Sequence, residues 1–262
     1  MTARRRPPSR PSVPELCVFG VAGLPEVKPG DDLAMLIASA LDRQTTPLLE
    51  GDVVVVTQKA VSKAEGRLVD LRRVRPSAFA RHLAQWSGKD PRRMELVLRE
   101  SRRIVKMDQG LVVSETHHGF VCADAGVDES NVPGPSVVSL LPVDPDASAQ
   151  RLRQVLERRY SVRLAVIISD TFGRPWRKGI VNVAIGVSGL HPLRDYKGEK
   201  DPHGYILKGT LIAVADELAS AAELVTGKLQ NIPIAVVRGY TYPATEGSIT
   251  EVLWEPEHDL FR

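Results

Sequence analysis

The sequence is poor in cysteine and contains no long apolar run. Its 262 residues include only two cysteines, Cys17 and Cys122, with no CxxC pair and no Cys/His set at zinc spacing. A disulfide scaffold and a zinc ribbon are therefore excluded, and we predict two buried free thiols in a reducing compartment. No apolar stretch approaches the ~20 residues that a membrane-spanning helix needs. These absences predict a soluble, cytoplasmic protein without a membrane partner.

The short motifs of the common nucleotide-binding and hydrolase folds are also missing. The sequence contains no GxxxxGK[ST] loop, no GxGxxG fingerprint, no GxSxG elbow and no HExxH. Each of these patterns sets glycines, a nucleophile or metal-binding histidines at a spacing that its chemistry requires. Their absence argues against a P-loop fold and a Rossmann fold.

Outside the first residues, neither positive nor negative charge is in large excess. Lys and Arg number 35 against 32 Asp and Glu, and much of the net +3 comes from the tail MTARRRPPSR. We predict a disordered basic Arg/Pro tail over residues 1–14 and one folded domain over residues 15–262, in which no subdomain boundary can be read. The nearly neutral body predicts no nucleic-acid partner, and binding of RNA or DNA by the tail alone would fade steeply with salt.

Apolar residues alternate irregularly between helix spacing and strand spacing. We predict helices where they recur at i, i+3 and i+4, the first beginning at Asp31 or Asp32. LVVSET and FVCAD around HHG indicate an antiparallel hairpin. This order predicts a mixed α/β or α+β fold, with mixed sheets and packed helices. The helix faces are Leu33, Leu36, Ile37, Ala40 and Leu41; Phe79, Leu83 and Trp86; Leu152, Val155 and Leu156; and Leu218, Ala221, Ala222 and Val225, and the strands include VVVVT, LAVIIS, VNVAIGVSG and IPIAVVRG.

Polar clusters follow three of the apolar strands. They are QKAVSK (58–63), DAGVDESN (124–131) and SDTFGRPWRKG (169–179). Polar residues at strand ends are where α/β proteins build their sites. Asp128 and Asp170 supply the carboxylates that Mg²⁺ and Mn²⁺ prefer, and Thr171 of the last cluster can add an oxygen.

Cations accompany these carboxylates and suit phosphates or carboxylates as ligands. The residues allow a metal-assisted phosphate site. They equally allow a second interpretation, in which the aspartates form caps or turns, the cations lie on a solvated loop and Trp176 anchors the core. The cations are Lys59, Lys63, Arg174, Arg177 and Lys178.

Six collinear segments between about Gly20 and Gly239 add a more specific signal. With them the chain resembles the coenzyme F420-0:L-glutamate ligase (gamma-glutamyl ligase) family, and its GKL segment resembles the actinobacterial branch. AGVDESN and SDTFGRPWR together are the most specific part of the resemblance. The segments are GLPEVKPGDDL, GDVVVVTQKAVSKAEGR, GFVCADAGVDESNV, SDTFGRPWRKGIVNVAIG, AVADELASAAELVTGK and IPIAVVRG.

The resemblance implies a GTP-dependent ligase that requires Mn²⁺ or Mg²⁺. Such an enzyme forms an amide between L-glutamate and the carboxylate of coenzyme F420-0, and can add further gamma-linked glutamates. GTP would activate the carboxylate as an acyl phosphate, leaving GDP and then phosphate. The resemblance also implies an unusual α+β fold in an interwoven homodimer.

The matching motifs imply roles for individual residues. Asp128, Asp170 and Thr171 would bind two metal ions, and the two aspartates would be catalytic. Arg174 and Arg177 are our own assignment, as catalytic clamps for carboxylate or phosphate. The residues expected to contact GTP are Leu24, Pro25, Glu26, Val27, Gln58, Lys63, Asn131, Gly227 and Lys228.

Three features depart from the family pattern. Asp124 stands where an Asn is usual, and Lys228 where many relatives carry a Gln or Glu that can serve a metal. Mycobacterial relatives carry a flavin-binding reductase-like domain after the ligase, and this sequence is expected to hold the ligase domain only. Asp124 and Lys228 favour an alternative, a regulatory homologue that binds GTP and metal but has lost ligation.

Overall fold

A five-stranded mixed sheet forms the centre of the molecule, in the order β1-β12-β2-β8-β9. The computed structural model describes residues 13–255 and 257–259, so the predicted tail, residues 1–14, lies outside the described part except for its last two residues. β2 and β8 run parallel, and the other neighbours run antiparallel. The strands are β1 (Cys17–Gly20), β12 (Ile234–Arg238), β2 (Val53–Thr57), β8 (Ala165–Arg174) and β9 (Arg177–Ser188).

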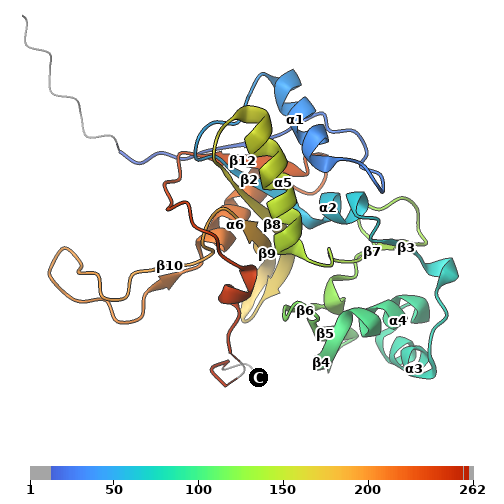
Figure 1. The fold of residues 1–262 in the computed structure, drawn as a ribbon. Coiled ribbons are helices and arrows are strands. Elements are labelled where there is room, and N and C mark those ends of the chain that lie inside the picture. Colours follow the sequence, from blue (N-terminus) through green and yellow to red (C-terminus); the bar gives the residue numbers. More distant parts are fainter. Residues whose placement is uncertain (1–12, 256, 260–262) are drawn as a thin grey trace, which may run out of the picture.

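Helices cover this sheet on both sides. Residues 53–56, 165–169 and 234–237 are all buried, as expected for inner strands with two covered faces. In Figure 1, α5 (Pro145–Tyr160) crosses in front of the sheet beside α1, whereas α6 (Val214–Thr226) packs against β1, β9 and β12. The predicted start of α1 (Leu33–Gln44) is confirmed, because Asp32 Oδ1 accepts the N–H of Met35 at 3.1 Å.

A second, smaller apolar core lies beside the sheet. α3 (Ala78–Ser87), α4 (Pro91–Glu100) and the sheet β4-β5-β6 surround it. The predicted hairpin is confirmed as β5 (Leu111–Thr116) and β6 (Val121–Ala123), whereas α4 and β4 (Ser101–Asp108) were not predicted. The ribbon β3-β7 joins this part to α2. The remaining elements are α2 (Gln58–Ala64), β3 (Leu68–Asp70), β7 (Val137–Ser139), and the short 3-10 turns Leu71–Arg73, Asp124–Gly126 and Ile249–Val252.

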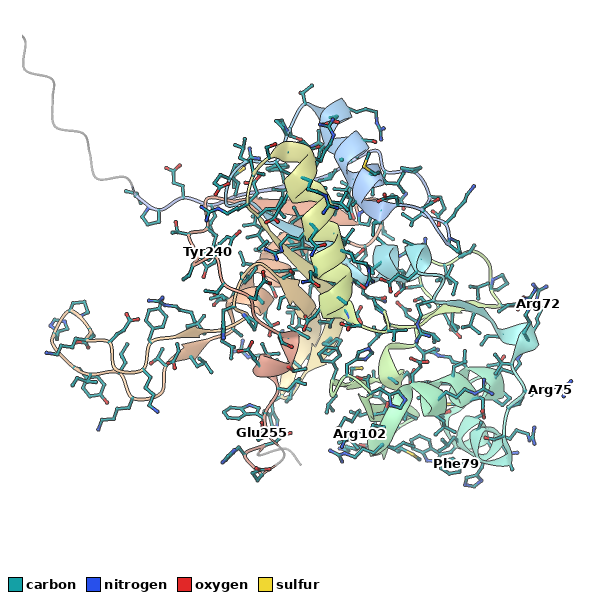
Figure 2. All side chains as sticks on the ribbon, viewed as in Figure 1. Arg72, Arg75, Phe79, Arg102, Tyr240 and Glu255 are labelled. Carbon is teal, nitrogen blue, oxygen red and sulfur yellow. The ribbon has the colours of Figure 1, made fainter. Side chains whose placement is uncertain are left out.

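Two predictions from the sequence are corrected by the structure. The predicted face of α3 is wrong in part: Leu83 is buried, but Phe79 and Trp86 are 53% and 42% exposed, and the helix buries Ala80 and Ala84 instead. Figure 2 shows Phe79 on the outer rim of this part, with Arg72, Arg75 and Arg102. Cys17 was predicted to be buried and is exposed, because it lies on the edge strand β1; Cys122 is buried as predicted.

β8 and β9 form one long hairpin that extends past the buried part of the sheet. The segment 169–179, interpreted as a polar cluster after a strand, is itself mostly strand, and the chain turns at Pro175 and Trp176. Trp176 is 85% exposed and so does not anchor the core. The strands are apolar only where helices cover them, which is why the sequence changes character after Ser169.

Carboxylates close the outer edge of β9 to further strand pairing. They come from α5 and α6 and accept backbone N–H groups along the strand. The three bonds run from Asn182 N to Glu223 Oε2 (3.1 Å), from Ala184 N to Asp216 Oδ1 (2.9 Å) and from Val187 N to Asp146 Oδ1 (2.7 Å).

The charged segment RDYKGEKDPHGY (194–205) belongs to an arm that projects from the body (Figure 1). A two-stranded ribbon of β10 (Arg194–Asp195) and β11 (Leu211–Ile212) closes its base. The separate sheets and packed helices confirm the predicted α+β class. Among the residues described, no helix has the length and apolar character to cross a bilayer.

Candidate functional site

A cavity of about 700 Å³ lies where the parallel strands β2 and β8 end. Thr57 of β2 is in register with Ser169 of β8, so the residues that follow each strand lie side by side. Gln58 and Lys59 begin α2 here, and Asp170 continues β8. The cluster 124–131 reaches the same cavity from the second core. The structure thus brings the three polar clusters of the sequence to one place, at the strand ends where α/β folds bind ligands.

Asp128 is fixed by both its backbone and its side chain. Its backbone pairs with Ser139 of β7, with N···O distances of 2.8 and 3.1 Å. Its Oδ2 accepts from Lys59 Nζ and from Ser130 Oγ, and its Oδ1 accepts the Ser130 N–H at 2.8 Å. Burial opposes ionisation, but Lys59 and Ser130 together hold the pKa of Asp128 below its ordinary value. Asp128 is therefore a carboxylate over the whole physiological pH range.

Asp170 lies in the same cavity, but its pKa is shifted in the opposite direction. Burial raises the pKa of Asp170 to about 6, and the negative charge of Asp128 adds to the effect. The backbone N–H of Thr171 and the charges of Lys59 and Lys228 counteract it only in part. Paired carboxylates with different pKa values are common in catalytic and ion-binding sites, because a low-dielectric site with two negative charges favours a cation.

Next to Asp170 in the sequence, Thr171 belongs to a closed polar ring with Asn182, Glu223 and Lys228. Thr171 Oγ1 donates to Asn182 Oδ1 at 2.8 Å and accepts from Lys228 Nζ at 2.5 Å. Lys228 Nζ also lies 3.4 Å from Glu223 Oε1, and Glu223 Oε2 accepts the Asn182 N–H. The ring fixes both the proton and a lone pair of the Thr171 hydroxyl.

Two uncharged buried polar groups in the cavity wall have no hydrogen-bond partner in the described part of the chain. Gln58 is 2% exposed; its Oε1 accepts from Ser62 Oγ at 2.8 Å, and its Nε2 is unpaired. Ser169 is 1% exposed, and its Oγ is unpaired. Leaving a buried donor unpaired costs roughly 1–3 kcal/mol, so such groups are usually satisfied by a ligand or water. Both groups are therefore suited to a polar ligand.

The predicted nucleotide contacts gather at this cavity, and Arg174 and Arg177 do not. Lys63 Nζ pairs with Glu26 Oε1 at 2.6 Å on the cavity wall. Arg174 and Arg177 are exposed near the tip of the β8–β9 hairpin and do not line the cavity. Arg174 donates instead to the backbone oxygen of Lys178 at 2.9 Å. The predicted residues that line it are Leu24, Pro25, Glu26, Val27, Gln58, Lys63, Asp128, Asn131, Asp170, Thr171, Gly227 and Lys228.

Asp124 is neutralised by two cations that the sequence analysis did not single out. Both of its oxygens accept from Lys89 Nζ at 2.7 Å, and Oδ2 also accepts from Arg93 at 2.8 Å. Its backbone is left-handed, as are the next two residues, with φ of 51°, 53° and 73°. Asp and Asn adopt this conformation more readily than most residues. These two ion pairs offset the negative charge of Asp124 and so reduce its repulsion of an anionic ligand.

Arg93 is the arginine that the structure places in the cavity wall. It also pairs with Glu129 at 3.2 Å, and its Nε is buried without a partner in the described residues. The Asp90–Pro91 start signal would have predicted its helix. Asn182, also missed, is a polar residue at the start of the apolar run of β9.

The fit of a metal ion differs between the two predicted positions. Asp128 and Asp170 offer carboxylate oxygens, and Mg²⁺ or Mn²⁺ would complete its shell with water and phosphate oxygens. No group of three or more His, Cys, Asp or Glu able to hold a metal occurs within residues 13–255 and 257–259. Thr171 does not fit a second ion, because its hydroxyl already bonds to Asn182 and to the ammonium of Lys228.

Comparison with known proteins identifies relatives along most of the chain. Residues 22–239 match the family described as F420-0:Gamma-glutamyl ligase. The protein named coenzyme F420:L-glutamate ligase of Methanothermobacter thermautotrophicus is 46% identical over 250 residues, covering 94% of this chain and 99% of the relative. Proteins of the same name from Methanopyrus kandleri and Methanocaldococcus jannaschii are 46% and 44% identical, covering 90% and 82% of this chain and 94% and 86% of their own lengths. The expected actinobacterial branch stays a prediction.

Proposed function

The chain belongs to the F420-0:gamma-glutamyl ligase family, and from this premise we propose that it joins L-glutamate to coenzyme F420-0 with consumption of GTP. The family is one of ligases that add glutamate to F420. The nucleotide, the metal and the route of the reaction are the parts that we infer for this chain. We also propose that the enzyme works in the cytoplasm.

One observation carries the proposal: a single cavity brings four cations together with four carboxylates, Asp128 and Asp170 among them. Asp128 and Asp170 form an acidic pair at the strand ends. Lysine and arginine side chains around them match the charge of a triphosphate and of a carboxylate substrate. The unpaired Gln58 Nε2 supplies a neutral donor for a base or phosphate oxygen. The cations are Lys59, Lys63, Arg93 and Lys228.

The inferred reaction has two steps. The carboxylate of F420-0 attacks the terminal phosphorus of GTP, so that an O–P bond forms, the bond to GDP breaks and an acyl phosphate results. The neutral amine of L-glutamate then attacks the acyl carbon. The amide forms, inorganic phosphate leaves and the amine proton passes to solvent. Mn²⁺ or Mg²⁺ at Asp128 and Asp170 would supply neutralisation of phosphate charge.

The protein's own residues would orient the reactants. Lys59 lies against Asp128 and would contact the phosphate chain, while Lys63 and the segment 24–27 line the wall expected to hold the nucleotide. Arg93 comes from the second core, opposite the sheet, and would bind a carboxylate of the acceptor or of glutamate. Fixed cations of this kind stabilise charge that develops during transfer.

We also propose a homodimer. Leu224 and Leu229, which flank Lys228 in sequence, are each 87% exposed, and Ile180 in the cavity wall is 58% exposed. Large exposed apolar side chains close in sequence to site residues are consistent with a surface that a partner covers. Sedimentation analysis is expected to give a dimer, and Leu224→Asp with Leu229→Asp is expected to shift it toward monomer. A monomeric wild-type protein would contradict this part of the proposal.

The function is tested by a mass-spectrometric ligation assay with GTP, Mn²⁺, L-glutamate and F420-0. We expect one or more glutamate mass increments, with GDP release that depends on both acceptor and glutamate. Asp170→Ala is expected to abolish product, and Arg174→Ala, outside the cavity, serves as its matched control. The second candidate, a ligation-deficient GTP- and metal-binding regulator, is favoured by Lys228 at Thr171. It predicts tight GTP binding in calorimetry with no mass increment.

A further inference from the structure

The ammonium of Lys228 lies where a bound cation would contact Thr171. Its Nζ donates to Thr171 Oγ1 at 2.5 Å and lies 3.4 Å from Glu223 Oε1. Lys228 also lies close enough for its charge to act on Asp170. A positive charge thus already lies at the Thr171 hydroxyl, close enough to act on Asp170.

The position of Lys228 is determined by the chain around it. Gly227 has φ 56° and ψ −164°, a backbone region that is essentially restricted to glycine. The N–H of Gly227 bonds to the backbone oxygen of Glu223 at 2.9 Å, which closes the end of α6. The special conformation of Gly227 therefore directs Lys228 toward Thr171 rather than along the helix axis.

The oxygens around this ammonium are not available to a second divalent ion. Thr171 gives its proton to Asn182 and a lone pair to Lys228. Glu223 Oε2 is bound to the N–H of Asn182 in the edge strand β9. A divalent ion at Thr171 would have to displace the ammonium and would otherwise be repelled by it at close range. Asp128 shares its carboxylate with Lys59 and Ser130, and Asp170 accepts the backbone N–H of Thr171; each carboxylate keeps lone pairs for a metal ion.

We propose that the ammonium of Lys228 replaces the second divalent cation, so that each site binds a single metal ion, at Asp128 and Asp170. This inference rests on the proposed function, in which cations stabilise the phosphoryl group in transfer. Lys228 and the metal ion then contact the transferred phosphate from opposite sides of Asp170. A protein-bound ammonium needs no concentration of free metal, so turnover depends on the first power of the Mn²⁺ concentration.

Metal stoichiometry tests the inference without relying on turnover. Manganese is titrated into the full chain with a non-hydrolysable GTP analogue, and free Mn²⁺ is followed by electron paramagnetic resonance. Wild-type protein is expected to bind one Mn²⁺ per chain beyond that bound by the free analogue, without Mn–Mn spin coupling. Lys228→Glu is expected to bind two coupled Mn²⁺ ions. Lys228→Met, the matched control, is expected to bind one and to lose about 100-fold or more in turnover.

Two results would overturn the inference. Two spin-coupled ions in the wild-type protein would show that Lys228 gives way to a second metal. A single ion in Lys228→Glu, with its fold verified by circular dichroism, would show that this position is not a cation position. If neither Mn²⁺ nor the GTP analogue binds, the proposed function itself fails, which is distinguishable from both results.

Discussion

The ammonium of Lys59 is hydrogen-bonded to the carboxylate of Asp128, although 69 residues separate them in the sequence. Lys59 begins the helix after a central strand, and Asp128 comes from the loop that leaves the second core. Their contact joins two parts of the fold across the cavity. It also means that a metal ion at Asp128 shares that carboxylate with a fixed cation.

Removal of this shared cation is expected to strengthen metal binding and weaken nucleotide binding. In Lys59→Met, Asp128 is no longer paired, so Mn²⁺ alone should bind several-fold more tightly, whereas GTP loses a cation that faces its phosphates. Calorimetry with each ligand separately measures both effects. Lys63→Met is the matched control: its ammonium pairs with Glu26, so only GTP affinity should fall. Unchanged Mn²⁺ affinity in Lys59→Met would refute the shared-carboxylate arrangement.

Asp170→Asn is expected to stabilise the fold in a pH-dependent way. The pKa of Asp170 is raised to about 6, so the wild-type protein loses stability as pH rises from the unfolded pKa near 4 to the folded one. Above pH 7 the loss is complete and amounts to about 3 kcal/mol. The gain in free energy of unfolding from Asp170→Asn should therefore be largest at pH 8 and shrink as pH falls from 6 to 4. Urea unfolding at pH 4.5 and 8 measures it, and an advantage independent of pH would contradict the prediction.

The two cysteines are expected to differ sharply in reactivity. Burial raises the pKa of Cys122 to about 12, so almost none of it is thiolate at pH 8, whereas Cys17 is exposed. Ellman's reagent should label one thiol rapidly and the second only after unfolding. Cys17→Ser should remove the fast phase. A fast phase that persists in Cys17→Ser would show that Cys122 is accessible.

Arg93 and Arg177 are expected to respond differently to substitution. Arg93→Met removes a cation from the cavity wall, and loss of a charge-assisted hydrogen bond should weaken binding of GTP or of a carboxylate substrate by about tenfold or more. Arg177→Met changes an exposed side chain outside the cavity and should leave both affinities unchanged. Thermal unfolding controls for the loss of the Arg93 ion pair with Asp124. An equal loss of affinity in Arg93→Met and Arg177→Met would show that the tip of the β8–β9 hairpin also contacts the ligand.

The sequence predicted those features that depend on local pattern. The apolar spacing from Leu33 to Leu41 and the capping Asp32 predicted α1 correctly, because both signals act within a few residues. The segment 58–63 and Asp170 were predicted as site residues from their positions after apolar strands, and the parallel pairing of β2 with β8 brings them together. Asp128 was selected with Asp170 because both are carboxylates in polar clusters that follow apolar strands, and the resemblance then implied that both bind a metal ion.

The features that were missed depend on contacts distant in sequence. Trp176 has a large apolar side chain that is typical of a core residue. However, the β8–β9 hairpin that carries it extends into solvent. Arg174 and Arg177 were selected for their charge, and hairpin geometry carries them away from the cavity. Arg93 reaches the cavity only because α4 packs against the turn that holds Asp124. No local pattern encodes which of several arginines faces the site.

The carboxylates that close β9 also limit how two copies of this chain can associate. Between Asn182 and Val187 the outward N–H groups are bound to Glu223, Asp216 and Asp146. A strand from another molecule therefore finds no donors there, and a continuous intermolecular sheet cannot grow across this edge. The homodimer that we propose must associate through side-chain packing or through another edge. Glu223 takes part in both this closure and the Lys228 ring, so a substitution there would alter assembly and catalysis together.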